Sequence, residues 1–401
     1  MKTDHSTING KSGARSSVEK GYASVLDMRT SDFFYYAGLA FFCVGFTLSS
    51  SELVEMEVLS VLPRVLEIVS LVLVFYSLFS SHSKYSGWEI ALFIPLALCV
   101  MVSAMRAGVA HVAITTLLIF GAKGISFRSI CKVVMTSIAV STVIVALLSL
   151  AGFFKYASSE IKLNPITGTM MVRYTYGFAH SNFLGRAIAC IFFTDICLRF
   201  RKLTWKSAVV WFVIALILFF HVGTYTSALI ISVGAVIVLV MKRLPTDLAV
   251  KTCAATSVIF IVLSFLLPLL YSPQNELLLL FDKIASDRLY WTHYCIERYP
   301  ITLFGQEIHT IGFADAALLG TEAFFLDNAC YRLLLNYGVL TAFLFVVVFI
   351  VDIIRCVKAC RVELLVVLAL LFLSGLSTQW PLIFYSSFPL LSLTADLESD
   401  S

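Results

Sequence analysis

The stretch KSAVVWFVIALILFFHVGTYTSALIISVGAVIVLVMKR, residues 206–243, decides the fold class. It contains two apolar runs, 207–221 and 224–241, joined by a short turn at Gly223. A helix needs about 20 mostly apolar residues to cross a bilayer. Lys or Arg stands at both outer ends and is absent from the turn, which is typical of a helical hairpin with its basic ends in the cytoplasm. The stretch therefore predicts two antiparallel membrane-spanning helices.

Comparable apolar runs recur along the whole chain, which is 59% hydrophobic and 13% charged. Soluble domains are about 45–50% apolar and about 25% charged. The composition therefore excludes a soluble domain, a disordered chain, a disulfide scaffold and a nucleic-acid binder. We expect an all-α polytopic membrane protein with about twelve transmembrane helices, ten or eleven being the alternative counts. The runs are 33–50, 58–80, 88–105, 107–122, 131–154, 182–199, 207–221, 224–241, 252–271, 331–353, 362–380 and 382–395.

The positions of the basic residues set the orientation. When twelve spans alternate, most of the 29 Lys and Arg residues fall on one side, which the positive-inside rule assigns to the cytoplasm. Both termini are then cytoplasmic, with a disordered tail over 1–32 and a short tail over 396–401 flanking a single transmembrane domain, 33–395. Two extracytoplasmic loops, about 155–181 and 272–330, are longer than connections require, and such loops are usually functional.

Arg173 begins the stretch RYTYGFAHSNFLGR at the end of the first outer loop. Arg173 and His180 flank an aromatic turn at Gly177, and Ser181 or Asn182 stands where the N-cap of the next span is expected. A helix N-terminus offers free backbone N–H groups and a positive dipole end, which favour an anion. The stretch is a candidate pyrophosphate cradle. The alternative gives Asn182 only a capping role and makes His180 an interfacial residue.

The second outer loop contains SDRLYWTHYCIERYPITLFGQ, residues 286–306. Its aromatic pattern predicts a short amphipathic helix in the membrane interface, with Arg288 near its beginning and Pro300 at its end. The planar guanidinium of Arg288 fits two phosphate oxygens in a way that Lys does not. The alternative is an aromatic belt with snorkelling arginines.

The third stretch is FLDNACYRLLLNYGVL, residues 325–340. Asp327 and Asn328 precede the tenth span and form a good helix-capping pair. Asn336 and Gly338 within the apolar run suggest close helix packing or a water-lined cavity. Asp327 is also a candidate carboxylate for orienting or deprotonating a hydroxyl, with capping as the alternative role.

Several classes of site are missing from the sequence. The ten cysteines show no metal-ligand spacing, and there is no nucleotide-binding loop, EF-hand or serine-hydrolase elbow. We therefore expect no metal and no cofactor, and ATP-driven transport is unsupported. A disulfide between Cys295 and Cys330, which lie in the long outer loop, is left open.

In their order, these three stretches resemble the bacterial O-antigen and capsular polysaccharide polymerase family (Wzy type), which is related to O-antigen ligases. That family shows an arginine followed by G-F-x-H-x-N, an arginine opening an interfacial helix that leads to F-G, and then an Asp-Asn pair. The matching residues are Arg173, Gly177, Phe178, His180, Asn182, Arg288, Phe304, Gly305, Asp327 and Asn328. The resemblance runs from about Lys155 to Val339. Many relatives also carry a Ser-Arg pair at the start of the eighth span, whereas HVGTYTSALI has no arginine there.

The resemblance implies a GT-C-like, metal-independent glycosyltransferase. Such an enzyme joins undecaprenyl-pyrophosphate-linked oligosaccharide repeats into O-antigen, capsule or exopolysaccharide at the outer face of the bacterial cytoplasmic (inner) membrane, with inversion of the anomeric centre. The implied partners are a lipid-linked oligosaccharide donor and acceptor and the lipid bilayer, with a chain-length regulator and a flippase as further candidates; no nucleic acid is expected.

The resemblance also assigns roles to residues. The pyrophosphate ligands would be Arg173, Arg288 and Asn182, the catalytic residues His180 and Asp327, and the supporting residues Gly177, Asn328 and Tyr331. Two alternative functions stay open. An O-antigen-ligase-like transferase moves the glycan to a different acceptor. A transporter of polysaccharide or lipid-linked sugars would show paired half-repeats with polar residues near mid-membrane, whereas the polar groups here gather in the outer loops.

Overall fold

The computed structural model describes residues 10–56, 59–80, 85–154, 159–163, 170–311, 320 and 324–397. It is mostly helical. Among these residues, seven helices are long and apolar enough to cross a membrane, so the chain is a helical, membrane-embedded protein. They are Thr30–Ser49, Leu62–Ser80, Gly87–Ala107, Phe127–Leu150, Trp205–Val222, Thr246–Leu270 and Ala329–Lys358.

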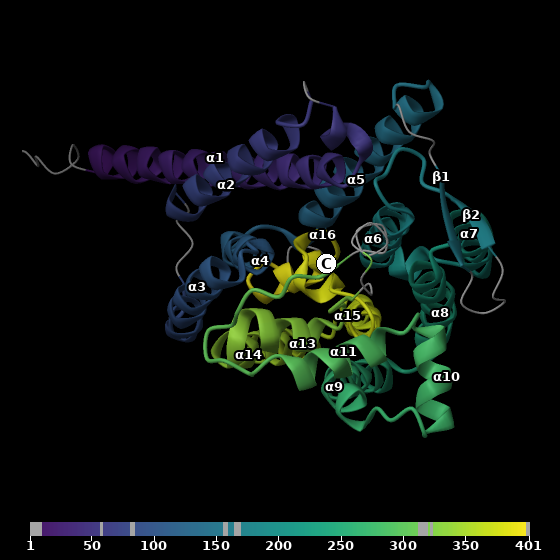
Figure 1. The fold of residues 1–401 in the computed structure, drawn as a ribbon. Coiled ribbons are helices and arrows are strands. Elements are labelled where there is room, and N and C mark those ends of the chain that lie inside the picture. Colours follow the sequence, from purple (N-terminus) through teal and green to yellow (C-terminus); the bar gives the residue numbers. More distant parts are fainter. Residues whose placement is uncertain are drawn as a thin grey trace, which may run out of the picture.

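The N-terminal half is built from hydrophobic helices joined by short turns (Figure 1). Its elements are α1 (Gly10–Ser49), η1 (Glu52–Glu55), α2 (Leu62–Ser80), α3 (Gly87–Ala107), α4 (His111–Gly121), α5 (Phe127–Leu150), β1 (Ser159–Leu163), β2 (Met170–Tyr174), α6 (Ser181–Arg199) and η2 (Phe200–Lys202). β1 and β2 form an antiparallel hairpin in which Ser159 pairs with Tyr174 and Leu163 with Met170. The hairpin is a local feature of an otherwise helical fold, which is consistent with the all-α expectation.

The C-terminal half contains α7 (Trp205–Ile217), the π-turn η3 (Leu218–Val222), α8 (Tyr225–Met241), α9 (Thr246–Leu270), α10 (Glu276–Ile284), α11 (Arg288–Arg298), α13 (Ala329–Arg332), the π-turn η4 (Leu333–Tyr337), α14 (Gly338–Lys358) and α15 (Val362–Gly375). The short helices η5 (Trp380–Leu382), α16 (Phe384–Ser387) and η6 (Phe388–Leu393) follow. Helix α11 matches the short helix that the aromatic pattern of residues 286–306 predicts, and α10 precedes it in the same predicted loop.

The N-terminal tail differs from the prediction. Helix α1 begins at Gly10, whereas the sequence predicts a disordered tail over residues 1–32. Residues 10–32 contain no proline, and the helix simply extends the first span toward the N-terminus. Residues 1–9 lie outside the described part of the chain.

Eleven of the twelve expected spans contain a helix, in three forms. Seven match the long apolar helices given above, and the runs 107–122, 224–241 and 362–380 contain the shorter helices α4, α8 and α15. With 11 residues, α4 is only about 16 Å long, well short of the bilayer core. The run 182–199 is α6, which carries Arg186, Asp195 and Arg199 and is the most polar of these helices. The count of twelve full spans is therefore not confirmed.

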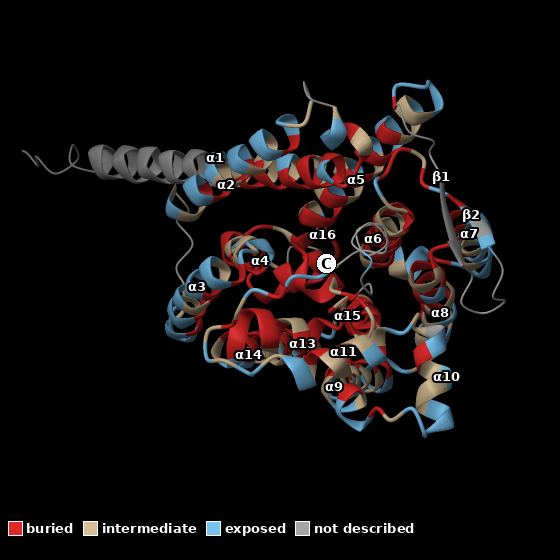
Figure 2. Ribbon diagram, in the orientation of Figure 1, coloured by how far each residue is buried: buried red, intermediate tan, exposed pale blue. Residues whose placement is uncertain are grey.

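The last predicted span, 382–395, is wrong as a continuous helix. Pro381 and Pro389 each stand at the beginning of a short 3-10 helix, where the missing N–H group is tolerated, so the run is divided into η5, α16 and η6. This segment, residues 380–395, is buried and lies in the middle of the molecule beside α4, α6 and α15 (Figures 1 and 2). Irregular backbone at membrane depth is tolerated where protein surrounds it.

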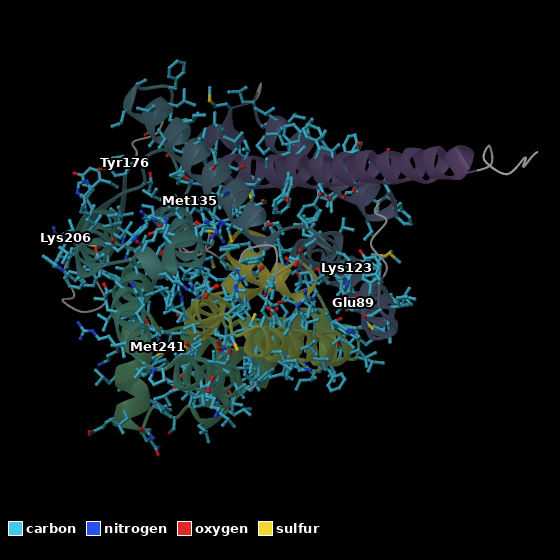
Figure 3. The ribbon with its side chains drawn as sticks, turned by 180° about the vertical axis from the view of Figure 1, so that it is seen from behind. Glu89, Lys123, Met135, Tyr176, Lys206 and Met241 are labelled. Carbon is cyan, nitrogen blue, oxygen red and sulfur yellow. The ribbon has the colours of Figure 1, made fainter. Side chains whose placement is uncertain are left out.

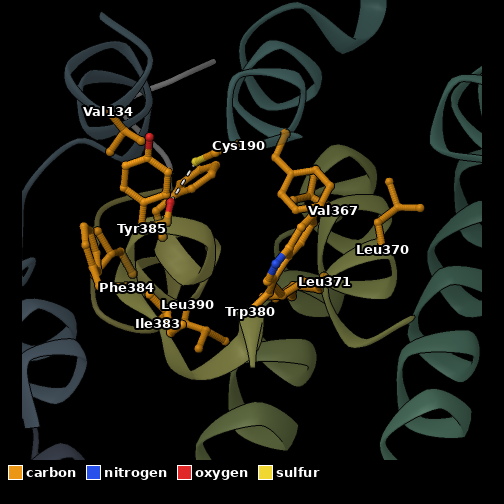
Figure 4. Packing of buried hydrophobic residues seen from close by; sticks show 14 of the residues in the cluster. Val134, Cys190, Val367, Leu370, Leu371, Trp380, Ile383, Phe384, Tyr385 and Leu390 are labelled. Atoms are coloured by element: carbon orange, nitrogen blue, oxygen red, sulfur yellow. Dashed lines mark hydrogen bonds between the residues drawn. The ribbon is translucent and has the colours of Figure 1, made fainter. Parts of the chain in front are cut away.

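The core lies where the C-terminal segment meets α15 and α6. Trp380 and Tyr385 pack among Val367, Leu371 and Cys190, and the Cys190 thiol donates to the backbone oxygen of Tyr385 at 2.8 Å (Figure 4). Large apolar side chains on the outer helices face away from this core; Phe79 and Met105 are 72% and 81% exposed. An apolar exterior of this kind is the surface that lipid covers.

Two buried carboxylates near helix ends, Glu89 and Asp195, are paired with basic side chains. Lys123 donates to Glu89 at 2.6 Å, joining the beginning of α3 to the turn after α4 (Figure 3). Asp195 accepts from Arg199 in the next turn of α6 and from the Trp211 indole at 2.9 Å. Both pairs lie at helix ends that the basic-residue distribution assigns to the cytoplasm.

Candidate functional site

A cavity of about 390 Å³ opens where several helix ends converge. We call it the first cavity. The ends of α1, α4, α6 and α8 contribute to it, together with the beginning of α11 and the segments before α13 and around η5. It is lined by Phe46, Ser49, Ser50, His111, Asn182, Phe183, Arg186, Thr226, Ser227, Arg288, Asp327, Thr378, Gln379, Trp380 and Ile383. Every one of these positions falls on the side that the sequence predicts to be extracytoplasmic.

Three of the predicted site residues line this cavity: Asn182, Arg288 and Asp327. The Arg288 Nε lies 3.0 Å from Asp327 Oδ2 in an ion pair, and its NH1 donates to Thr226 Oγ1 at 3.2 Å. The other Asp327 oxygen accepts from Gln379 Nε2 at 3.3 Å. The pair joins the second and third sequence stretches across the cavity.

Asp327 is not the helix cap. Asn328 is the N-cap of α13, and its Oδ1 accepts from Tyr331 N at 3.0 Å. The Asn328 amide also donates to the backbone oxygen of Ser264 at 3.0 Å, while the Tyr331 hydroxyl donates to the backbone oxygen of Phe265. Asn328 and Tyr331 therefore anchor α13 against α9, as expected of supporting residues, and leave the Asp327 carboxylate facing the cavity.

Arg288 is held in place from behind by Asp282. Asp282 Oδ1 accepts from the backbone N–H groups of Leu289 at 2.7 Å and Tyr290 at 3.2 Å, and so caps the beginning of α11. Ser286 and Asp287 adopt left-handed backbone conformations that turn the chain between α10 and α11. Burial raises the pKa of the Asp282 carboxyl, an effect that these N–H donors oppose.

Arg186 is the main site residue that the sequence reasoning did not select. It lies one helical turn after Asn182, is 6% exposed and lines the cavity. Its guanidinium packs against the rings of Phe46, Phe183 and Tyr385 at 5.0, 5.1 and 5.6 Å. Within the described residues no carboxylate pairs with it, and its Nε has no hydrogen-bond partner. Its i, i+4 spacing from Asn182 was the available signal, because positions four apart share a helix face.

His111 also lines the cavity. It is the first residue of α4, and its ring centroid lies 6.2 Å from that of Phe46. The cavity thus has an aromatic and cationic wall formed by α1, α4 and α6.

His180 occupies a different position from the one predicted. It is itself the N-cap of α6, with Nδ1 accepting from Asn182 N at 3.0 Å, so neither Ser181 nor Asn182 is the cap. A neutral ring with an accepting Nδ1 carries its proton on Nε2. His180 does not line the first cavity.

Arg173 lies behind the cavity. It is 2% exposed on β2, and its guanidinium stands 5.4 Å from the centre of the Tyr225 ring. It packs against Gly223, where an added Cβ would come within 2.7 Å of Arg173 Cγ. Because Tyr225 precedes the cavity residue Thr226, Arg173 supports the beginning of α8 and does not line the cavity itself.

Gly177 forms the predicted turn. Its φ is +83°, and an added Cβ would lie 2.5 Å from Phe154 Cε2. The Gly177 oxygen accepts from Glu52 N at 2.9 Å, and Ser51 and Phe178 form an isolated bridge. The turn therefore ties the loop before α6 to the end of α1, next to Ser49 and Ser50.

The F-G turn and the polar break after α13 contact each other directly. Gln306 N donates to the Asn336 oxygen at 3.1 Å, and Val339 N donates to the Thr302 oxygen at 3.0 Å. An added Cβ on Gly305 would stand 1.9 Å from the Asn336 oxygen, so only glycine fits there. Close packing against the F-G turn therefore requires glycine at position 338, where an added Cβ would lie 2.3 Å from Gly305 N, and the Asn336 amide donates to the Gln306 oxygen at 3.3 Å.

Across the described residues, no group of three His, Cys, Asp or Glu side chains is arranged to hold a metal ion. Cys295 and Cys330 are both buried and are free thiols. Compared with known proteins, the chain matches no family model, no curated protein and no solved structure. Its function is therefore argued from the first cavity and from the three sequence stretches alone.

Proposed function

We propose that the chain is a polysaccharide polymerase of the Wzy type, which joins polyprenyl-pyrophosphate-linked oligosaccharide repeats at the extracytoplasmic face of a bacterial cytoplasmic membrane. The observation that carries this proposal is the first cavity, in which Arg186 and Arg288 share one space and only Arg288 is paired with a carboxylate. An unpaired, buried guanidinium is unfavourable unless an anion reaches it. A ligand with more than one negative charge fits both arginines.

A pyrophosphate diester has this chemistry. It carries two negative charges and several acceptor oxygens, and the planar fork of arginine binds two of them at once. Fixed cations that meet the charge developing on a leaving group are a major source of rate enhancement. Arg186 and Arg288 would supply those cations, and Asn182 beside them offers an amide for a further oxygen. We therefore give Arg186 the pyrophosphate role that the sequence assigned to Arg173.

The ion pair suggests how Asp327 acts. When a pyrophosphate oxygen binds Arg288, the Asp327 carboxylate 3.0 Å away loses its ion-pair partner. Asp327 then becomes available as a base. An acceptor sugar hydroxyl then attacks the anomeric carbon of the donor. The new C–O bond forms as the bond from that carbon to the pyrophosphate oxygen breaks; the hydroxyl proton goes to Asp327, and the electron pair leaves with the pyrophosphate. Attack opposite the leaving group inverts the anomeric centre.

His180 has a more limited role in this scheme. Its Nδ1 lone pair already accepts the Asn182 N–H, so the ring orients the beginning of α6 and with it Asn182 and Arg186. We therefore place Asp327, rather than His180, as the base.

The test is the size of the cell-surface glycan in the bacterium that encodes the chain. We expect that deletion of the gene shortens the cell-surface glycan. The ladder of long glycan chains should be replaced by single repeat units attached to their final acceptor. Arg288→Lys should also shorten the glycan to single repeat units, although the variant protein still inserts into the membrane. The ammonium group of lysine is a point charge and cannot replace the planar guanidinium in binding two phosphate oxygens. The matched control is Arg298→Lys on the same helix, where the arginine is outside the cavity and bonds Tyr294; it should keep the ladder.

The deletion strain also separates the alternatives. Full-length polymer left on its lipid carrier would identify a ligase and overturn the polymerase proposal. Lipid-linked repeats trapped at the cytoplasmic face would identify a transporter. An unchanged ladder in Arg288→Lys would remove Arg288 from the donor site.

A further inference from the structure

A second cavity, of about 590 Å³, lies at the other end of α6. Helix α6 begins at the first cavity with Asn182 and ends at the second cavity with Arg199. The beginnings of α5, α9 and α15 complete its wall. All of these helix ends fall on the side that the basic residues assign to the cytoplasm.

Positive charge is in excess around this second cavity. Its charged lining residues are Arg128, Arg199, Arg201, Lys202, Arg361 and Glu363. Glu363 pairs with Arg361 at 2.6 Å, and Asp195 behind the wall pairs with Arg199. No described carboxylate pairs with the other three cations. The cavity therefore presents an uncompensated field that attracts an anion.

Backbone groups add to the same field. Helices α9 and α15 begin at this cavity without any side-chain cap, since their N-cap residues are Pro245 and Arg361. The first backbone N–H groups of a helix have no intrahelical partner, and the helix dipole makes that end positive. Two uncapped helix beginnings facing a basic cavity provide N–H donors as well as charge, which is the combination that binds phosphate.

The remaining wall is apolar. Phe127, Leu198, Phe200 and Leu364 line the cavity beside the charges. Nearby, Trp205 is 65% exposed at the beginning of α7, as is typical of a side chain at the headgroup level of a membrane. A soluble anion would gain nothing from this apolar wall, whereas a lipid would bury its glycerol and first acyl carbons there.

We infer that the second cavity binds the phosphate headgroup of an anionic phospholipid from the leaflet at that end of the molecule. Basic pockets between transmembrane helices suit such headgroups. The inference is independent of the glycan polymerase proposal, because none of the residues involved lines the first cavity.

The test is lipid retention by the purified full-length chain, measured by native mass spectrometry with phosphatidylglycerol or phosphatidylcholine. We expect phosphatidylglycerol to be retained preferentially. Arg201→Gln/Lys202→Gln should weaken its binding about 25-fold, at about 5-fold for each cation near a membrane surface. The matched control, Lys206→Gln/Arg243→Gln, removes the same charge at the same end from exposed positions outside the cavity and should bind nearly as wild type does.

Three results would overturn the inference. The first is an equal loss of phosphatidylglycerol binding in Arg201→Gln/Lys202→Gln and in Lys206→Gln/Arg243→Gln. That result would show that the lipid is attracted to all of the basic residues at this end of the molecule and not to the second cavity. The second is equal retention of the two lipids. The third is displacement of phosphatidylglycerol by inorganic pyrophosphate, which would assign the cavity to a soluble anion. If the double variant does not insert, Arg128→Gln in the first turn of α5 tests the same cavity with one exposed residue.

Discussion

The two ends of α6 present arginine in opposite surroundings. At its beginning, Arg186 is buried among three aromatic rings. At its end, Arg199 is exposed and bonded to Asp195, and further exposed cations surround it. Water and salt screen exposed charges, whereas a buried charge acts at nearly full strength on whatever reaches it. A small number of buried charges is suited to catalysis on one bound ligand. A larger number of exposed charges is suited to binding a lipid headgroup reversibly.

The strongest test of this difference is Asp327→Asn. The amide keeps the shape of the side chain but cannot take a proton, so kcat should fall about 100- to 10,000-fold. The KM for the lipid-linked donor should stay equal or fall, because the carboxylate no longer competes for Arg288. Initial rates with purified protein and lipid-pyrophosphate-linked repeats measure both. Asp287→Asn, an exposed position outside the cavity, is the control; a normal kcat in Asp327→Asn would exclude the base role.

The second test replaces a buried cation. Arg186→Gln should lower kcat/KM about 100- to 1,000-fold, the effect of losing one fixed donor to a leaving group. Arg201→Gln, at the other end of α6, should leave the rate within a factor of two. Equal losses in the two variants would mean that the two ends do not differ in function.

The third test concerns packing beside the first cavity. Gly185 precedes Arg186, and an added Cβ would lie 2.6 Å from Ser227 Oγ and 2.7 Å from Thr224 Oγ1. Gly185→Ala should therefore push α6 from α8 and lower the free energy of unfolding by about 1–3 kcal/mol. Thermal unfolding in detergent measures it. Gly87→Ala, where an added Cβ meets nothing within 4 Å, should change stability by less than about 0.5 kcal/mol.

The smallest effect is expected at Asp282, which supports the first cavity as Asp195 supports the second. Because burial raises the pKa of Asp282 in the fold, its contribution to stability is largest at low pH and is lost as pH rises through that pKa. Asp282→Asn keeps an acceptor for the N–H groups of α11, so its stability relative to wild type should improve from about pH 4 to about pH 8. Asp282→Ala should lose about 1 kcal/mol through the missing cap. Thermal unfolding measured across this pH range checks both variants. If the stability of Asp282→Asn relative to wild type does not change with pH, the raised pKa of Asp282 does not affect stability.

Sequence patterns predicted the membrane class, seven of the spans and the short helix α11, and they singled out Arg288 and Asp327, which the fold brings together. Hydropathy succeeds for helices that meet lipid, because each needs a long apolar run. It failed for 382–395, since a segment surrounded by protein can be apolar without being one helix. It also failed for the β1–β2 hairpin, whose strands are only five residues long.

The sequence could not show which of two arginines lines the first cavity. Arg173 and Arg186 belong to one short stretch, and proximity in sequence did not show which of them faces the cavity. Arg173 lies on a strand behind Tyr225, whereas Arg186 lies on the helix face that Asn182 begins. Trp380 and Gln379 come from a segment more than fifty residues after Asp327, and only the tertiary fold brings them to the same cavity.

The irregular C-terminal segment has a consequence for how the protein is made. Trp380 and Ile383 form part of the first cavity, and both follow α1 to α15 in the chain. Arg355 NH2, near the end of α14, donates to the Ala395 oxygen at 2.6 Å, and Arg361 NH1 donates to the Leu397 oxygen at 2.8 Å. A nascent chain that has already inserted all of its apolar helices therefore still lacks one wall of the cavity. The segment follows α1 to α15 in the chain, so the first cavity cannot be complete before residues 379–383 have been synthesised.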